Sequence, residues 1–143
     1  MTVRAILSRK GRDVATIAPT ASLSEAVRLL AERRIGAVVV TGPENRVAGI
    51  LSERDIVRSL SERGPAAVED NVAAVMTRKV MTCTEAETVA AIMERMTAGK
   101  FRHLPVVEQG QLAGIISIGD VVKHRLNEME AESAALRDYI QTA

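Results

Sequence analysis

The hydrophobic pattern of the chain runs through one series of elements in its first half. A short apolar segment at 14–17 is followed by a helical stripe from Leu23, a uniformly apolar run at 37–40 and another apolar run at 47–51. Spacing of three and four predicts a helix, and a uniformly apolar run predicts a strand buried on both faces. With a second helix after residue 52, the pattern predicts strand, helix, strand, strand, helix.

The same pattern begins again at Val80. The helical stripe recurs 66 positions along the chain, where Val89, Ile92, Met93 and Met96 take the places of Leu23, Ala26, Val27 and Leu30. The turn at 109–111 is one residue shorter than its counterpart, so the offset becomes 65 beyond it. An internal repeat indicates two copies of one unit, and a unit this small needs its twin to cover its sheet. We predict an α/β (α+β) fold of two β-α-β-β-α repeats packed about a pseudo-twofold axis.

Three segments lie outside the repeats. Val3, Ile6 and Leu7 are spaced for a short lead-in helix that ends at Gly11. A short helix is also expected at about 72–76, and the last helix continues beyond the second repeat. The predicted organisation is a lead-in segment and first repeat at 1–65, a linker at 66–79, a second repeat at 80–126 and a C-terminal helix extension at 127–143.

A Ser-x-x-Asp motif follows the last strand of each half. Ser52 and Asp55 in the first half are matched by Ser117 and Asp120, 65 positions later. A serine at the N-cap with a carboxylate three residues on forms a capping box, worth about 1 kcal/mol. The free N–H groups of a helix start also favour an anion, and an ionised carboxylate accepts hydrogen bonds from sugar hydroxyls. One copy would indicate capping alone, whereas two equivalent copies also predict paired sugar-phosphate sites.

The final helix is longer than a repeat requires. Its apolar positions recur in steps of four and three, which is the period of a coiled coil; they are Val122, Leu126, Met129, Leu136 and Ile140, with Ser133 interrupting the series. Such a stripe needs a partner, either the body of the same chain or a second copy. We expect the second copy, and hence a homodimer.

Composition argues against two classes of partner. The net charge is +1 and the chain has one Phe, one Tyr and no Trp, so it lacks the basic surface and stacking groups of nucleic-acid binding. No apolar run approaches the roughly 20 residues of a membrane span, and the N-terminus lacks a signal-peptide core. We therefore expect a soluble, cytoplasmic protein.

The cysteine and the two histidines offer little reactive chemistry. Cys83 is the single cysteine, and we expect a small buried side chain rather than a redox group. His103 and His124 have no partners at metal-ligand spacing, so no metal site is predicted. We expect His103 in a pocket wall or a packed strand and His124 at the surface.

Taken together, these features resemble the CBS-domain pair, also known as a Bateman module. The resemblance rests on a threonine at the first strand of each half, Thr16 and Thr82, and on the apolar-Gly-apolar-apolar-Ser-x-x-Asp motif. It also rests on the strand Arg102-His103-Leu104-Pro105-Val106-Val107. The resemblance covers about 3–126 and implies a stand-alone tandem CBS protein.

In that family the clefts between the repeats bind adenosine-containing ligands such as AMP, ADP, ATP or NAD(H). The resemblance implies that Asp55 and Asp120 hold ribose hydroxyls and that Ser52 and Ser117 contact phosphate. The remaining implied contacts, including the backbone that would face the base, are Thr16, Ile17, Ala37, Thr82, Cys83, His103 and Pro105.

The two halves differ in the charges near these clefts. Arg102 stands where the first half has Gly36, so only one copy brings a guanidinium to the cleft strand, where it could pair with phosphate. Arg54 and Lys100 are either further phosphate partners or solvated surface charges. The two clefts are therefore expected to differ in affinity.

These observations favour a non-catalytic regulatory module, an energy sensor in which an adenine nucleotide shifts the arrangement of the repeats. The sequence has no Walker lysine motif, GxGxxG fingerprint or readable nucleophile-base pair, so no catalytic residue or catalytic cofactor is predicted. The alternatives are a nucleotide-processing enzyme and a purely structural dimerisation module. A sensor would also need an effector protein, which the sequence does not identify.

The ribose hypothesis carries an expectation for mutants. Replacing Asp55 or Asp120 by alanine should weaken ribonucleotide binding by about 1–3 kcal/mol through loss of charge-assisted hydrogen bonds. Little change in melting temperature is expected, because the carboxylate is assumed to serve the ligand.

Overall fold

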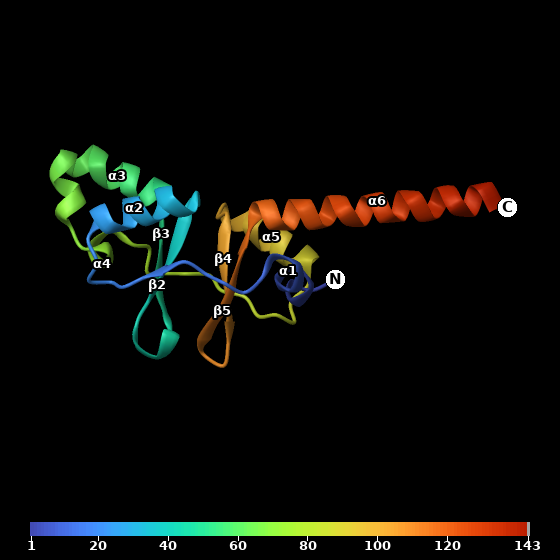
Figure 1. Ribbon diagram of the computed structural model, residues 1–143, viewed down its shortest axis with the longest axis horizontal. Helices are drawn as coiled ribbons and strands as arrows, with labels where there is room; N and C mark the ends of the chain where they lie inside the picture. The colour runs from blue at the N-terminus through green and yellow to red at the C-terminus, as the bar shows by residue number, and fades with distance from the viewer. Residues whose placement is uncertain (143) are drawn as a thin grey trace.

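Two small sheets lie side by side at the centre of the computed structural model, which describes residues 1–142 (Figure 1). In the first sheet, β1 is parallel to β2 and β2 is antiparallel to β3. The second sheet is the antiparallel pair β4 and β5. The strands are β1 (Thr16–Ile17), β2 (Ala37–Thr41), β3 (Val47–Ser52), β4 (His103–Glu108) and β5 (Gln111–Ser117).

The two antiparallel hairpins have the same register. Ala37 is opposite Ser52 in the first hairpin, and His103 is opposite Ser117 in the second. Each also has a register shift at the equivalent place, after Val40 and after Val106. Because register is set by which side chains face the core, a shared register confirms the predicted α/β fold of two related repeats.

Helices cover the outer faces of both sheets. The first repeat has α2 (Leu23–Arg33) and α3 (Glu53–Arg63), and the second has α5 (Val89–Gly99) and α6 (Ile118–Thr142). Two short 3-10 helices, η1 (Pro43–Asn45) and η2 (Gly64–Glu69), complete the first half. Figure 1 shows α6 projecting far beyond the body; Ala143, the last residue of the predicted extension, lies outside the described residues. None of the helices within 1–142 has both the length and the apolar character needed to cross a membrane.

The lead-in segments are exchanged between the repeats. Helix α1 (Val3–Lys10) packs into the core of the second repeat, and α4 (Val72–Val75) packs into the core of the first. The second core contains Val3, Ile6, Leu7, Cys83, Val89, Ile92, Met96, Leu104, Val106, Ile116 and Val121. The first contains Leu23, Ala26, Leu30, Val38, Val40, Leu51, Ile56, Val72 and Met76. There are thus two cores rather than one shared core, and each is completed by a segment that lies outside its repeat.

The glycine of each repeated motif accommodates the exchanged segment. A Cβ on Gly49 would lie 2.7 Å from Met76 Sδ and 2.8 Å from the Thr77 carbonyl oxygen. A Cβ on Gly114 would lie 2.8 Å from a methyl carbon of Leu7. Only glycine leaves room for such close approach, so the two motif glycines hold equivalent packing positions.

The first strand of the second repeat is shorter than predicted. Only Cys83 forms a bridge, parallel to Val106, through hydrogen bonds to the backbone of Pro105 and Val107. The carbonyl of Thr82 instead accepts a hydrogen bond from Arg95 Nη2 at 2.7 Å. The Arg95 side chain therefore occupies the carbonyl oxygen of Thr82, which a longer strand would use for pairing with β4.

Several apolar positions on the two helices of the first repeat are exposed. Val27, on α2, is 41% exposed, and Ala31 on the same helix is also exposed. Val57 and Leu60 on α3 are 65% and 37% exposed. The buried stripes of these helices are therefore narrower than the apolar sequence pattern.

Candidate functional site

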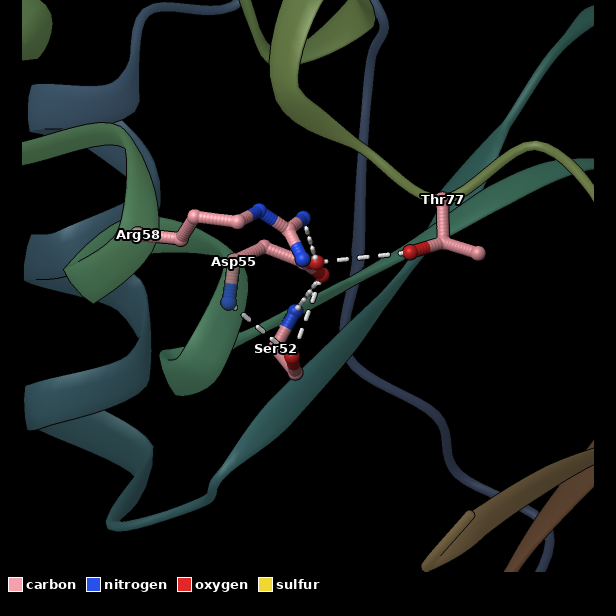
Figure 2. Close-up of polar contacts among 4 residues, drawn as sticks. All are labelled: Ser52, Asp55, Arg58 and Thr77. Atoms are coloured by element: carbon pink, nitrogen blue, oxygen red, sulfur yellow. Dashed lines mark hydrogen bonds and ion pairs between the residues drawn. The ribbon is translucent and has the colours of Figure 1, made fainter. Parts of the chain in front are cut away.

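Asp55 closes a complete capping box at the start of α3. Its Oδ2 accepts hydrogen bonds from the backbone N of Ser52 at 2.9 Å and from Ser52 Oγ at 3.0 Å, while its own N donates to Ser52 Oγ at 3.3 Å (Figure 2). The local sequence alone specifies this arrangement, since serine and a carboxylate three residues later satisfy each other's backbone donors.

The same carboxylate ties the helix to the linker. Asp55 Oδ1 accepts from Arg58 Nη2 at 2.7 Å and from Thr77 Oγ1 at 3.3 Å, as Figure 2 shows. Asp55 is only 5% exposed. Thr77 also exchanges two backbone hydrogen bonds with Ile50 of β3, so the linker is held beside the motif at two points.

A cavity of about 500 Å³ opens beside Asp55. Three parts of the chain line it: the Ser-x-x-Asp motif of the first repeat, the linker, and the start of β4 in the second repeat. The lining residues are Gly36, Ala37, Ile50, Ser52, Glu53, Arg54, Asp55, Arg58, Thr77, Lys79, Val80, Met81, Lys100, Phe101, Arg102 and His103. A cavity of this volume is of the size that holds a small organic ligand.

The lining is strongly cationic. It contains five cations, Arg54, Arg58, Lys79, Lys100 and Arg102, against the carboxylates of Glu53 and Asp55. Burial, together with the charge of Lys10, lowers the pKa of His103 below its ordinary value of 6.5, so this imidazole is neutral at pH 7. The net charge of +3 favours an anionic ligand, and guanidinium groups suit phosphate oxygens.

The equivalent carboxylate in the second repeat has a different partner. Asp120 Oδ2 accepts from the backbone N of Ser117 at 2.9 Å, as Asp55 does from Ser52. It also lies 2.6 Å from Lys10 Nζ, which donates to the carbonyl of Ile115 at 2.9 Å as well. An ammonium group from α1 therefore bridges the carboxylate and the neighbouring strand.

Lys10 governs the electrostatics of this second motif. Burial alone would raise the pKa of Asp120, but hydrogen bonds from Lys10 and Ser117 and the charge of Lys10 outweigh it and lower the pKa. Asp120 lines a smaller cavity, of about 200 Å³, with Lys10, Lys123 and His124 among its neighbours. The two motifs thus differ in the cation that contacts the aspartate, which is Arg58 for Asp55 and Lys10 for Asp120; the predicted difference in affinity stays a prediction.

The structure brings together half of the predicted site residues. Ala37, Ser52, Arg54, Asp55, Lys100, Arg102 and His103 line the larger cavity. Those absent from its lining are Thr16, Ile17, Thr82, Cys83, Pro105, Ser117 and Asp120. Thr16 and Ile17 form β1, which pairs with the far edge of β2, and this position explains their separation from the cavity.

Two individual residues have clear surroundings. Cys83 is 2% exposed in the second core, and burial, reinforced by the charge of Glu87, raises the pKa of its thiol to about 12. It is the expected packed, protonated side chain. His124 was expected at the surface, and this is wrong: it is 4% exposed, because α1 packs against the start of α6. Its Nε2 lies 2.9 Å from Glu128 Oε1 but is not aligned for a hydrogen bond.

Sequence reasoning missed the contribution of the linker. Thr77, Lys79, Val80 and Met81 all line the cavity, as does Phe101 before β4. One signal was available: Val72, Met76 and Lys79 stand 69 positions after Val3, Leu7 and Lys10. Lys79 is thereby the counterpart of Lys10, which identifies both lysines as motif neighbours.

The fold and the cavity define a tandem-repeat module with a ligand-sized site where its two halves and their linker meet. The chain belongs to the CBS-domain family: the model of the CBS domain matches residues 3–62 and again 72–127. A mitochondrial CBS domain-containing protein of Arabidopsis thaliana is 35% identical over 121 residues, which cover 82% of this chain and 59% of that protein. The chain therefore spans less than two thirds of that relative, and the cytoplasmic location expected from the sequence stays a prediction.

Solved structures share the whole fold. The CBS-domain containing protein of Agrobacterium tumefaciens is 49% identical, with a TM-score of 0.83 over 87% of this chain and 92% of that one. A CBS domain protein of Pyrobaculum aerophilum, complexed with AMP, is 27% identical, with a TM-score of 0.75 over 84% of this chain and 89% of that one.

Proposed function

We propose that this chain is a regulatory module that binds an adenine nucleotide, AMP, ADP, ATP or NAD(H), in the cavity beside Asp55. The observation that carries the proposal is a cavity of about 500 Å³ whose lining contains five cations and the buried carboxylate of Asp55. The cations suit the phosphates and the carboxylate suits the ribose hydroxyls. The AMP complex of the Pyrobaculum relative supports adenosine as the nucleoside.

Within this site the phosphates have several donors. Arg54 and Arg102 are exposed, they line the cavity from opposite repeats, and their side chains make no hydrogen bond or ion pair within 1–142. Asp55 Oδ1 is shared by Arg58 and Thr77, so a ribose hydroxyl would take the place of one of these donors. Arg58 is the easier to displace, because its side chain is 56% exposed.

A ligand bound at this site would change how the two repeats are arranged relative to each other. Ser52 and Asp55 belong to the first repeat, Lys100 and Arg102 to the second, and Lys79 to the linker between them. A bound nucleotide contacts all three parts, so it favours the arrangement in which they converge. Its effect equals its difference in affinity between arrangements, typically 1–3 kcal/mol.

A titration panel tests the proposal. AMP, ADP, ATP, NAD(H) and S-adenosylmethionine are added to nucleotide-free protein in a calorimeter, with thermal shift measured in parallel. We expect saturable heat with at least one adenine nucleotide, at one ligand per chain, because Lys10 holds Asp120. Absence of both heat and shift with every ligand contradicts the proposal, and hydrolysis of the nucleotide in the same samples would indicate an enzyme instead.

Arg102→Ala provides the site test. Loss of one charge-assisted contact should weaken nucleotide binding by about 1–3 kcal/mol, with the melting temperature unchanged, because Arg102 is exposed and supports no other side chain. Arg28→Ala removes an exposed arginine of α2 that does not line this cavity and serves as the matched control. Equal affinities for the two variants would place the ligand elsewhere.

A further inference from the structure

The carboxylate of Asp55 is fully engaged by groups of the chain itself. Its Oδ2 accepts two hydrogen bonds from Ser52, and its Oδ1 accepts one from Arg58 Nη2 at 2.7 Å and one from Thr77 Oγ1 at 3.3 Å. An ionised carboxylate offers about four acceptor positions, so all of them are taken. A ribose hydroxyl can therefore reach Asp55 only in place of one of these donors.

Arg58 is the donor that can leave. Ser52 holds Oδ2 through the capping box, and Thr77 exchanges two backbone hydrogen bonds with Ile50, which fix its place beside the carboxylate. Arg58 has no such support, because it reaches Asp55 by a long side chain that is 56% exposed (Figure 2). A charge that stays in contact with solvent loses little when its ion pair opens, so the guanidinium is the least costly of the donors to displace.

A second acidic partner for Arg58 lies further along α3. Glu62 follows Arg58 by four positions, the spacing at which opposite charges meet on a helix surface. Both side chains line a hollow of about 410 Å³ that α3 and α4 border, and the Glu62 carboxylate makes no hydrogen bond or ion pair in the described part of the chain. Asp55 and Arg58 line this hollow as well as the larger cavity. Arg58 can thus pass from Asp55 to Glu62 by turning its side chain along the helix.

The second repeat has no equivalent pair of acidic partners. Asn127 stands 65 positions after Glu62, and its amide carries no charge. The cation that contacts Asp120 comes from a different helix, α1. A cation with two carboxylate partners on its own helix is therefore a feature of the first motif.

We propose that Arg58 is an internal competitor of the ribose: a bound nucleotide takes the Oδ1 position of Asp55 from the guanidinium, which moves to Glu62. This role rests on the proposed function, because it concerns the same cavity. Arg58 keeps the buried carboxylate paired when no ribose contacts it, and only a ligand that brings hydroxyl donors to Asp55 compensates for its departure. In this respect Arg58 differs from Arg102, which is expected to contact phosphate.

Binding of adenosine to the full chain tests the competition, because adenosine carries the ribose but no phosphate that could attract Arg58. Ligand-observed NMR measures its Kd, and ATP is titrated in parallel. Arg58→Met removes the competitor and leaves Asp55 one donor short, so it should lower the Kd of adenosine about threefold to tenfold. Arg28→Met, which removes an exposed arginine outside the cavity, should leave that Kd unchanged.

Substitution of Glu62 tests where the guanidinium goes. Glu62→Lys places a like charge at the position to which Arg58 moves, so it should raise the Kd of adenosine about threefold. The same change in an Arg58→Met background should have no effect, since no guanidinium remains to be moved. Because Glu62 is exposed, the variant should keep its fold.

Three results would overturn this role of Arg58. The first is an adenosine Kd that Arg58→Met leaves unchanged or raises, or no adenosine binding by either protein while ATP binds the parent. The second is an effect of Glu62→Lys that is equal in both backgrounds. The third is a lower Kd in Thr77→Val but not in Arg58→Met, which would identify Thr77 as the displaced donor. If neither adenosine nor ATP binds the parent, the proposed function itself fails.

Discussion

Asp55 combines structural contacts with a place in the candidate site. Its carboxylate accepts four hydrogen bonds, two from Ser52 and one each from Arg58 and Thr77, while it is 5% exposed. Asp120 keeps the backbone contact to Ser117 but gives its second contact to Lys10. Equivalent residues thus have different neighbours, and only Asp55 lines the larger cavity.

Asp55→Ala should therefore destabilise the fold as well as weaken nucleotide binding. Loss of the capping box and of the contact to Thr77 should lower the free energy of unfolding by about 1–3 kcal/mol. This replaces the expectation of an unchanged melting temperature, which ignored the burial of the carboxylate. Urea unfolding measures the change, with Asp13→Ala, whose side chain is 95% exposed, as the control. An unfolding midpoint equal to that of the parent would contradict the structural role.

Lys10→Met should raise the pKa of His103. Burial is the larger cause of the lowered pKa, and the positive charge of Lys10 is the next, so removing that charge raises the pKa towards 6.5. A lowered pKa in the folded state costs stability as the pH falls from about 6.5 to the folded pKa, because the unfolded chain binds the proton first. In Lys10→Met the folded-state pKa of His103 lies closer to 6.5, so the protein should lose less stability as the pH falls through this range.

Histidine NMR titration measures that pKa directly. Lys123→Met removes another cation near Asp120 that does not act on His103, and it should leave the value unchanged. If Lys10→Met and Lys123→Met have the same effect, the proposed influence of Lys10 is wrong.

The sequence predicted the surroundings of residues whose contact partners are near them in the chain. Ser52 with Asp55 is readable because three residues separate them in one helical turn. The contact of Lys10 with Asp120 spans 110 positions, and no local pattern announces it. His124 was misplaced for the same reason, since the helix that buries it comes from the other end of the chain.

At the scale of elements, the exchange of α1 and α4 joins the two repeats. Each helix fills the core of one repeat while its connecting chain leads into the other. The strand and helix order followed from periodicity, because each repeat is built from local patterns. The exchange of α1 and α4 could not be predicted in this way, because the apolar pattern of a short helix does not indicate which of the two cores it joins.

Leu7→Ala tests the exchange. Leu7 is 1% exposed in the second core, so truncation should cost about 2–5 kcal/mol of unfolding free energy through lost burial and a cavity. Val57→Ala, at a position 65% exposed, should cost little. Hydrogen exchange in Leu7→Ala should show the loss of protection first in α5 and β5; loss confined to α1 would mean that α1 is only an appendage.

At the scale of the whole molecule, the two repeats keep the pseudo-twofold arrangement, but the charged residues around their Ser-x-x-Asp motifs differ. The larger cavity gathers cations from both repeats and the linker, whereas Lys10 neutralises the second aspartate within the chain. A ligand in the first position would therefore act on the joint between the halves. Figure 1 shows that α6 projects away from the body of the chain, so most of this helix lies apart from that joint.

The central claim is that an adenine nucleotide occupies the cavity beside Asp55, and a heteronuclear NMR titration with ATP tests it most directly. The account predicts saturable shifts of the backbone amides at 52–55, 77–81 and 100–103, with those at 117–120 largely unchanged. Saturable shifts centred on 117–120, or none in the three cavity segments, would contradict it.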